Sequence, residues 1–291
     1  MKTTDKNIHS CGRVLAGIVL FNPDIERLRQ NIDAIIGQVD KLVLVDNGSD
    51  DTAYTDALDM SGVEYIKNEC NRGIAFALNQ ILQYACSNGF SWALTLDQDS
   101  VASKNLMSIY SGIADTDKVG IVCCKTIDRN FVESHQKEEL PDREVKYCIT
   151  SASLTNVKAW NEVGGFDNSM FIDWVDWDIC IAMRHHGYKI VKTDRTYILH
   201  ELGTNTSIRH FCGMQLMILN RSAFRYYYVA RNWIYLGRKW KEENLVVKIM
   251  QVIKMYLVAL IYETDKWKNT KAFARGMYDG FRMKVNRYGQ K

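Results

Sequence analysis

Two short clusters of aspartates stand out in the 291-residue sequence. The first is Asp97-Gln98-Asp99, which directly follows the apolar run Trp92–Leu96. Carboxylate oxygens suit Mg²⁺, which typically takes one or two carboxylates and completes its shell with water and phosphate oxygens. The same spacing is common in turns, where aspartate is favoured without any metal. Taken alone, the motif is more typical of a turn than of a metal site.

The second cluster is Asp173-Trp174-Val175-Asp176-Trp177-Asp178. Three carboxylates within six residues repel one another, and partial burial beside two tryptophans predicts a raised pKa for at least one of them. Such a carboxylate suits a general base that works near neutral pH. The alternative is a helix N-terminus enriched in acid by the helix dipole, which we prefer for Asp178. Trp174 and Trp177 offer flat surfaces for a sugar ring, or else pack in the core.

The segments around the first cluster alternate between short apolar runs and helix-like stretches. Strands are predicted over Val14–Phe21, Leu42–Val45, Val63–Lys67, Trp92–Leu96 and Val119–Cys124. Helices are predicted over Ile25–Ile36, with Asn22 as cap and Pro23 in the first turn, and over Ile74–Ala85. This alternation is typical of an α/β fold with a mainly parallel sheet flanked by helices. Ligands of such sheets bind at the carboxyl ends of the strands, where Asp97 and Asp99 lie.

The C-terminal part of the chain is helical, basic and rich in aromatic residues. Of the 37 Lys and Arg residues, 16 lie from Arg221 onward, against five of the 34 acidic residues, so this part carries +11 and the rest −8. It also holds 14 of the 32 aromatic residues. An anionic membrane surface, a second copy of the chain, and an aromatic core with solvated lysines are all consistent with this composition.

One helix of this part, Leu245–Tyr262, is strongly apolar. At 100° per residue its polar residues gather on one side, which predicts an amphipathic helix with Lys248, Gln251 and Lys254 facing solvent. The two lysines argue against a transmembrane span.

The remaining composition excludes several classes of protein. With 47% hydrophobic and 24% charged residues, the chain is neither collagen-like nor disordered. Eight cysteines without a C-x-x-C pair argue against a zinc ribbon or a thioredoxin motif, and the absence of a signal-peptide pattern favours a reduced, cytoplasmic protein. The sequence has no helix-turn-helix, zinc or RNP signature, so we expect no nucleic-acid partner.

A series of motifs from about residue 13 to about residue 240 resembles the family 2 inverting glycosyltransferases, which have the GT-A fold. The resemblance is greatest to the bacterial rhamnosyltransferase branch. The motifs are Val19–Pro23, Val43–Ser49, Asn71–Ala75 with Asn79, Leu96–Ser100, Gly164–Asp167, Phe171–Asp176, Gly187–Ile190, His200–Gly203 and Arg225–Asn232. The resemblance implies a GT-A catalytic domain over residues 1–210 and a helical extension over residues 211–291.

The resemblance also implies roles for residues that would bind the donor. Asp46 would accept the imide N–H of a uracil or thymine base, although it also fits a plain turn. Phe21 and Asn22 would contact the nucleotide, and Asn71-Arg72-Gly73 opens a helix whose N-terminus favours phosphate. Asp97 would lie near the ribose or the donor sugar.

Metal and acceptor contacts follow from the same resemblance. Asp99, with Asp97, would hold Mg²⁺ or Mn²⁺. His200 would lie on a loop that closes over the diphosphate, as a metal ligand or a hydrogen-bond donor, and a purely structural histidine fits equally well. Asp176 would be the catalytic base, while Asp173, Trp174 and Trp177 would contact the acceptor or the sugar.

The implied reaction moves L-rhamnose from dTDP-β-L-rhamnose to a saccharide or lipid-linked saccharide, as in O-antigen and other bacterial surface polysaccharides. The enzyme would be cytoplasmic, with peripheral contact to the inner face of the membrane through its C-terminal helices. A UDP-sugar donor, galactose or N-acetylglucosamine, is the alternative. A further alternative is a non-catalytic sugar-binding relative. Such a protein would be expected to lack at least one of the carboxylates Asp97, Asp99 and Asp176, all of which are present here.

Overall fold

The structure, a computed structural model, describes residues 9–52, 54–128, 140–200, 207–211, 214–218 and 220–285. The chain divides into two compact units. The first comprises Met1–Asn168 and Ile179–Glu201, and the second comprises Ser169–Asp178 and Leu202–Lys291. The second unit therefore takes in a ten-residue stretch from the middle of the sequence, which contains Asp173 and Asp176.

The first unit is built on a sheet of nine strands among its described residues, in the order β3-β2-β1-β4-β8-β6-β9-β5, with β7 beside β9. The strands are β1 (Val14–Leu20), β2 (Lys41–Asp46), β3 (Val63–Lys67), β4 (Trp92–Asp97), β5 (Val101–Ala102), β6 (Val119–Asp128), β7 (Arg143–Glu144), β8 (Ser153–Asn156) and β9 (Lys189–His200). Strands β3, β2, β1 and β4 run parallel, as do β6 and β9. The short strands β5, β7 and β8 pair antiparallel, so the whole sheet is mixed.

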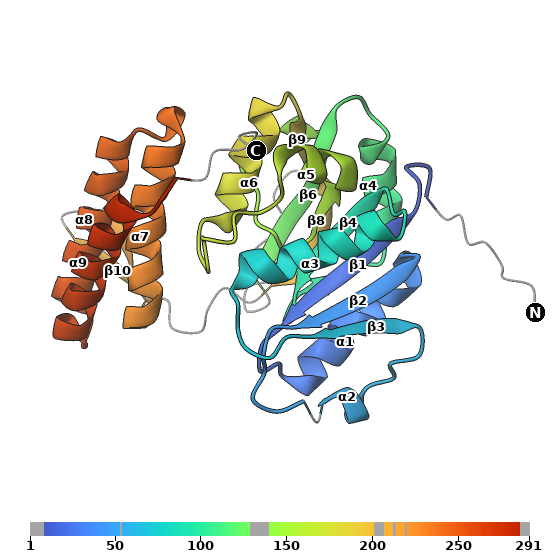
Figure 1. The fold of residues 1–291 in the computed structure, drawn as a ribbon, viewed down its shortest axis with the longest axis horizontal. Coiled ribbons are helices and arrows are strands. Elements are labelled where there is room, and N and C mark those ends of the chain that lie inside the picture. Colours follow the sequence, from blue (N-terminus) through green and yellow to red (C-terminus); the bar gives the residue numbers. More distant parts are fainter. Residues whose placement is uncertain are drawn as a thin grey trace, which may run out of the picture. The chain divides into compact units, whose positions relative to one another are not determined.

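Helices cover both faces of this sheet (Figure 1). They are α1 (Ile25–Ile35), α2 (Tyr54–Ala57), α3 (Ile74–Ser87), α4 (Leu106–Ala114) and α5 (Val157–Val163), followed by α6 (Val175–His185), which begins in the second unit. All seven residues of β1 are buried. Alternate residues of β1 join α1 and α4 in one core cluster, while Gly17 on the other face lies against Ile81 of α3, where a Cβ would clash. The predicted α/β architecture is confirmed.

The start of α1 differs from the prediction. Its cap is Asp24, whose carboxylate accepts a hydrogen bond from the Arg27 N–H, and Pro23 precedes the helix. Asn22 instead has a φ of 47° and bonds to Asp50 across the loop that follows β2. The prediction of Asn22 as cap is therefore wrong, because its amide is engaged in joining two loops.

The second unit is mainly helical. A hairpin of β10 (Ser207–Phe211) and β11 (Met214–Ile218) precedes α7 (Ala223–Lys239), α8 (Leu245–Tyr262) and α9 (Lys266–Arg282). The three helices share a core cluster: Tyr226, Val229, Ala230, Trp233, Ile234, Val252, Ala259 and Phe273. Gly276 and Gly280 of α9 lie directly against the α7 backbone, where a Cβ would be about 2.5 Å or less from the carbonyls of Tyr227 and Arg231. The predicted helical C-terminal region is confirmed.

Helix α8 has the predicted bounds, but the predicted solvent face is wrong at Lys248. Lys248 is buried and forms an ion pair with Glu243 at 2.6 Å. Large apolar side chains lie exposed on the opposite side, among them Val246, Met250 and Ile261. Within the described residues, α8 is the one helix that is long and apolar enough to cross a membrane, by length and composition.

Candidate active site

The carboxyl ends of β1, β2 and β4 meet at one edge of the sheet. In the register of the parallel pairs, Leu20 lies beside Asp46, and Val19 lies beside Asp97. Hydrogen bonds join the loops that follow these strands. The Phe21 N–H donates to Gln98 Oε1 at 2.8 Å, and the Asn22 N–H donates to Ser49 Oγ at 2.9 Å. The fold therefore gathers most of the predicted donor-binding residues at the edge where α/β sheets bind ligands.

Asp46 is fully buried and its carboxylate is already engaged. Oδ1 accepts from the Ser49 N–H at 2.8 Å, and Oδ2 accepts from the hydroxyls of Tyr54 and Tyr65 at 2.8 and 2.9 Å. Burial alone would raise the pKa of Asp46, but these hydrogen bonds outweigh it and the pKa is lowered. Contact with a nucleotide base stays a prediction.

The lowered pKa of Asp46 gives a testable pH dependence. The native state keeps this carboxylate charged below its ordinary pKa of 3.8, so its stabilisation is present above that value and disappears as the pH falls through the lowered pKa. We expect Asp46→Asn to cost about 1–3 kcal/mol at pH 7, and the difference from wild type to shrink below about pH 4. Urea unfolding between pH 3 and 7 measures it, with the exposed Asp56→Asn as control. A difference that stays constant with pH would contradict this.

The N-terminus of α3 is tied to the same edge by Asn47. The Asn47 side chain accepts from the Arg72 N–H at 3.1 Å and donates to Asn71 Oδ1 at 3.1 Å and to the Gly73 carbonyl at 3.2 Å. Gly73 has a φ of 88° and supplies no side-chain cap. The Arg72 side chain is exposed, with its guanidinium 3.5 Å from the ring centre of Phe76. A helix N-terminus without a side-chain cap, beside an arginine, suits a phosphate group.

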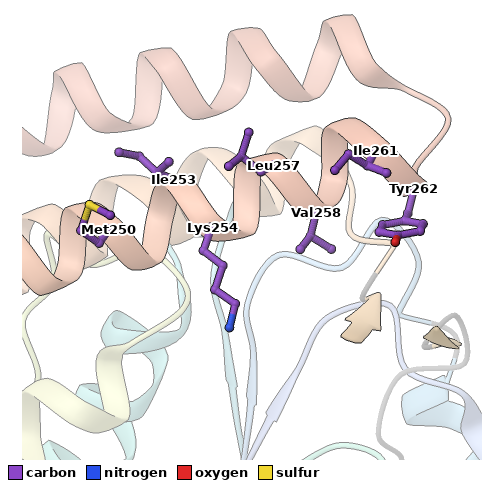
Figure 2. A pocket seen from close by; sticks show the side chains of 7 residues that line it. All are labelled: Met250, Ile253, Lys254, Leu257, Val258, Ile261 and Tyr262. Atoms are coloured by element: carbon purple, nitrogen blue, oxygen red, sulfur yellow. The ribbon is translucent and has the colours of Figure 1, made fainter. Parts of the chain in front are cut away.

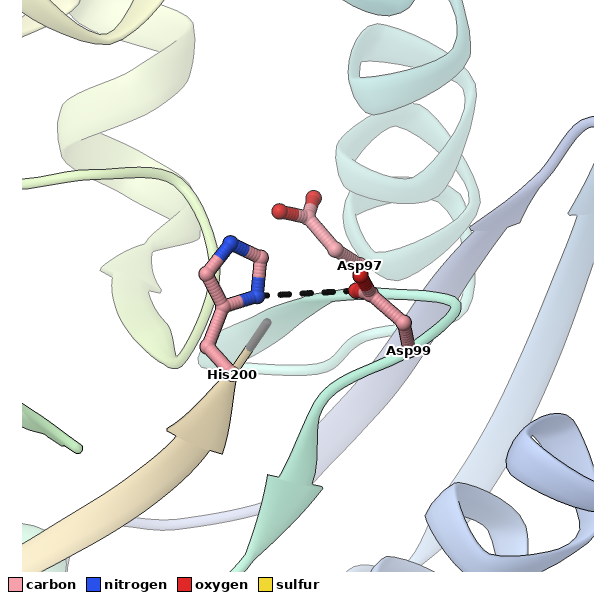
Figure 3. A group of neighbouring side chains, drawn as sticks. All are labelled: Asp97, Asp99 and His200. Carbon is pink, nitrogen blue, oxygen red and sulfur yellow. Dashed lines mark ion pairs between the residues drawn. The ribbon is translucent and has the colours of Figure 1, made fainter. Parts of the chain in front are cut away.

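Asp97, Asp99 and His200 form a cluster (Figure 3). One ligand atom from each lies within 4.8 Å of the other two. Asp97 ends β4, Asp99 lies in the turn that follows, and His200 ends β9. His200 Nδ1 lies 3.5 Å from Asp99 Oδ1 and 2.9 Å from Ser100 Oγ. The prediction of His200 on a loop is therefore corrected, since it is the last residue of a long strand.

The charges of this cluster are strongly coupled. Burial raises the pKa of Asp97, and Asp99 adds to this while His200 opposes it. Burial would raise the pKa of Asp99 as well, but its hydrogen bond to His200 and the charge of that ring outweigh burial and lower it. The same hydrogen bond raises the pKa of His200. Asp99 is therefore the carboxylate of the pair that stays charged most readily beside the imidazole.

The cluster fits a divalent cation. Two carboxylates and an imidazole converge from two strand ends that the sheet holds in place, and all three side chains are partly exposed. A cation bound there would keep open positions for phosphate oxygens, as hard divalent cations do in phosphate-binding sites. The predicted ligands Asp97, Asp99 and His200 are thus brought together as a candidate metal site.

Asp173 and Asp176 belong to the second unit. Asp173 and Trp174 both have left-handed backbone conformations, with φ of 68° and 65°, immediately before α6. Non-glycine residues reach this region only under strain, which persists where surrounding contacts impose it. One such contact comes from Asn232 of α7, whose Nδ2 donates to the carbonyls of Ile172 at 2.7 Å and Asp173 at 2.9 Å. Asp176 follows in the first turn of α6.

Each carboxylate of this stretch has a different environment. Burial raises the pKa of Asp173, opposed by Arg225, whose Nη2 lies 2.7 Å from Asp173 Oδ1. Asp178 is fully buried and accepts hydrogen bonds from Lys239 at 2.8 Å and Trp240 at 2.7 Å, which agrees with a structural role. Asp176 is partly exposed and accepts from the Trp177 N–H at 3.0 Å. Of the three, Asp176 is the one whose surroundings suit proton exchange with a ligand.

Trp174 and Trp177 pack against α7 and α8. The ring centre of Trp174 lies 4.3 Å from that of Trp233, in an edge-to-face arrangement, and 5.0 Å from that of Trp177. The Lys248 ammonium lies 3.9 Å from the Trp233 ring centre and 5.0 Å from that of Trp177. These contacts explain both rings as packing residues, and contact with a sugar stays a prediction.

Several residues that organise the site could not be identified from their residue type alone. Asn47, Gln98 and Asn232 hold loops through side-chain amides, and each lies inside a motif that the resemblance covers. Asn79 does the same on α3, where it accepts from the Phe166 N–H at 2.8 Å and donates to the Phe166 carbonyl at 2.8 Å. Their position within the motifs could have singled them out, because short amides are well suited to bonding loop backbone.

Comparison with known proteins agrees with this geometry. The model of the family "Glycosyl transferase family 2" matches residues 16–174, which is more than half of the chain. The chain is 27% identical over 271 residues, 88% of its length and 90% of the relative's, to "dTDP-rhamnosyl transferase RfbF" of Shigella flexneri. The predicted family and glycosyltransferase class are confirmed.

Solved glycosyltransferase structures share the fold at low sequence identity. GalNAc-T7, solved with UDP, GalNAc and Mn²⁺, has a TM-score of 0.60 at 14% identity, and the match covers 94% of this chain but only 57% of that one. A mannosyltransferase from Pyrobaculum calidifontis, solved with GDP-Man and Mn²⁺, has a TM-score of 0.56 at 14% identity, over 91% and 74% of the two chains. TarS 1–349 of Staphylococcus aureus has a TM-score of 0.56 at 12% identity, over 93% and 80%. With a GT-A fold and a family match over residues 16–174, the chain belongs to glycosyl transferase family 2.

Proposed function

We propose that this glycosyltransferase transfers L-rhamnose from dTDP-β-L-rhamnose to a saccharide, with inversion at the anomeric carbon. The observation that carries the donor assignment is the similarity to a dTDP-rhamnosyl transferase over 88% of the chain. The geometry supports the class of reaction: an uncapped helix N-terminus, an arginine and a carboxylate–imidazole cluster lie at the carboxyl ends of the strands of one sheet.

One set of residues would bind the donor, and another would act on the acceptor. Asp97, Asp99 and His200 would hold a divalent cation, which offsets the negative charge of the departing diphosphate. Because one ligand is an imidazole nitrogen, we propose Mn²⁺ in preference to Mg²⁺, which favours oxygen ligands alone. The exposed guanidinium of Arg72 and the first N–H groups of α3 would bind phosphate oxygens.

Asp176 would act on the acceptor. Its carboxylate takes the proton of the acceptor hydroxyl while that oxygen forms a bond to the anomeric carbon on the face opposite the leaving group. The bond between the anomeric carbon and the diphosphate oxygen breaks, dTDP leaves with that electron pair, and the proton stays on Asp176 until solvent removes it. A single displacement of this kind inverts the anomeric configuration.

The acceptor in this proposal is a saccharide or a lipid-linked saccharide for a bacterial surface polysaccharide such as O-antigen. In this proposal the enzyme works in the cytoplasm or at the inner face of the membrane. A UDP-sugar is the alternative donor, since uracil and thymine differ by one methyl group.

A thermal-shift experiment separates these donors. We expect dTDP with Mn²⁺ to raise the melting temperature more than UDP, GDP or CDP, because a ligand stabilises the native state according to its concentration relative to its Kd. Without metal, the shift with dTDP should be smaller. A larger shift with UDP would move the donor to the alternative, and no shift with any nucleotide would overturn the proposal. Release of dTDP from dTDP-β-L-rhamnose is the follow-up measurement.

A further inference from the structure

Helix α8 presents an apolar ridge to its surroundings. The ridge residues recur every three or four positions along the whole helix: Val246, Met250, Ile253, Leu257 and Ile261. Their exposed fractions range from 37% for Ile253 to 67% for Val246. Four of them line a shallow hollow of about 280 Å³ with Lys254, Val258 and Tyr262 (Figure 2). Lys254 is its one charged residue.

The opposite side of α8 holds the helix in this orientation. Lys248 pairs with Glu243 at 2.6 Å, and both side chains are buried. The ammonium also lies over the Trp233 ring at 3.9 Å, and Val252 and Ala259 join the core of the three helices. Rotating α8 to bury the ridge would expose this core and break a buried ion pair, which is strongly destabilising. The ridge therefore faces outward in the folded unit.

A second copy of the chain is a poor match to the ridge. An 18-residue helix is about 27 Å long and about 10 Å wide, so its outward face covers roughly 300 Å², against about 800 Å² per partner in a stable interface. Lys254 also lies at the middle of the helix. A two-fold pairing centred there would bring two Lys254 ammonium groups towards the axis, where like charges repel.

The charges around the ridge favour an anionic lipid surface. Between residues 241 and 284, eight basic side chains are exposed. Only two acidic side chains, Glu242 and Asp265, are exposed in the same range. Trp267, in the first turn of α9, is 69% exposed, and the Lys271 ammonium lies 4.9 Å from its ring centre. Exposed tryptophan and lysine beside an apolar helix face are typical of proteins that lie in the headgroup region of a bilayer.

We propose that α8 lies in the plane of an anionic membrane, with the ridge in the acyl-chain boundary and the surrounding lysines and arginines at the phosphates. Lys254, at the edge of the ridge, reaches the headgroups with its long side chain. The helix does not span the bilayer, because spanning would carry the paired Lys248 and Glu243 into hydrocarbon. The proposal goes beyond sugar transfer and stands independently of the donor.

Sedimentation of the full chain with sucrose-loaded vesicles tests this, with no nucleotide present. We expect binding to vesicles of phosphatidylcholine and phosphatidylglycerol, and binding at least about tenfold weaker to phosphatidylcholine alone. The double variant Ile253→Glu/Leu257→Glu should bind the anionic vesicles at least about tenfold more weakly, since it removes two apolar contacts and adds two negative charges.

Two control variants carry their new charges at exposed positions outside the ridge. Gln251→Glu adds one negative charge, and Gln251→Glu/Thr264→Glu adds two, the same number as the ridge variant. We expect the ridge variant to lose clearly more binding than the two-charge control, with both keeping the wild-type circular dichroism spectrum and melting temperature. An equal loss in both would overturn insertion of the ridge. Insertion of the ridge would also be overturned if the wild type did not bind vesicles and was a dimer in light scattering while the ridge variant was a monomer.

Discussion

Asp99→Asn is expected to abolish the dependence of dTDP binding on Mn²⁺ and to lower turnover by about 10²–10³-fold. The Asp99 carboxylate is one of the three groups of the candidate metal site, with its Oδ1 3.5 Å from His200 Nδ1. Its lowered pKa means that it carries its charge at neutral pH, as a cation ligand must. An asparagine keeps the shape of the side chain but removes the negative charge, which would be needed to compensate the metal ion for the loss of its hydration.

Titration of Mn²⁺ into the enzyme at fixed dTDP, read by melting temperature, measures this effect apart from turnover. The control is Asp117→Asn, an exposed aspartate outside the cluster, which should behave as wild type. His200→Ala should give an intermediate loss, because two carboxylates remain. If Asp99→Asn kept the full response to Mn²⁺, the cluster would be a structural hydrogen-bond network and the metal site would have to be sought elsewhere.

The strand-end part of the site could be predicted from the sequence because it depends on local patterns. Residues Trp92–Leu96 form a largely apolar run, and a run of this kind between helices predicts a buried strand of an α/β sheet. Asp97 and Asp99 then fall at its carboxyl end without further information. The placement of His200 could not be obtained this way. It depends on the pairing of β9 with β6, whose register shifts between Cys124 and Lys125.

Other features were hidden because they depend on contacts between distant residues. Asp173 and Trp174 adopt left-handed conformations, which favour glycine, and this stretch is held by hydrogen bonds from Asn232, about 60 residues later. For α8, periodicity showed which residues share a face but not which face is buried. The usual assumption that the lysines face water fails at Lys248, because Glu243 neutralises its charge and Trp233 covers it.

Asp176→Asn is expected to lower turnover by about 10²–10⁴-fold while changing the affinity for dTDP less than twofold. In the proposed reaction this carboxylate acts on the acceptor hydroxyl, so an amide in its place removes the base but no contact to the nucleotide. The side chain is partly exposed and accepts a hydrogen bond from the Trp177 N–H, which an amide oxygen can also accept.

Asp178→Asn is the matched comparison, because it makes the same chemical change two residues away. Asp178 is fully buried against Lys239 and Trp240, so its replacement leaves a buried ammonium without its charge partner and should lower the melting temperature markedly. Asp176→Asn, at a partly exposed position, should leave the melting temperature near that of wild type. Loss of turnover at wild-type stability and dTDP affinity therefore identifies a base. Loss of dTDP affinity together with turnover would instead make Asp176 a donor ligand, and the base would have to be another group.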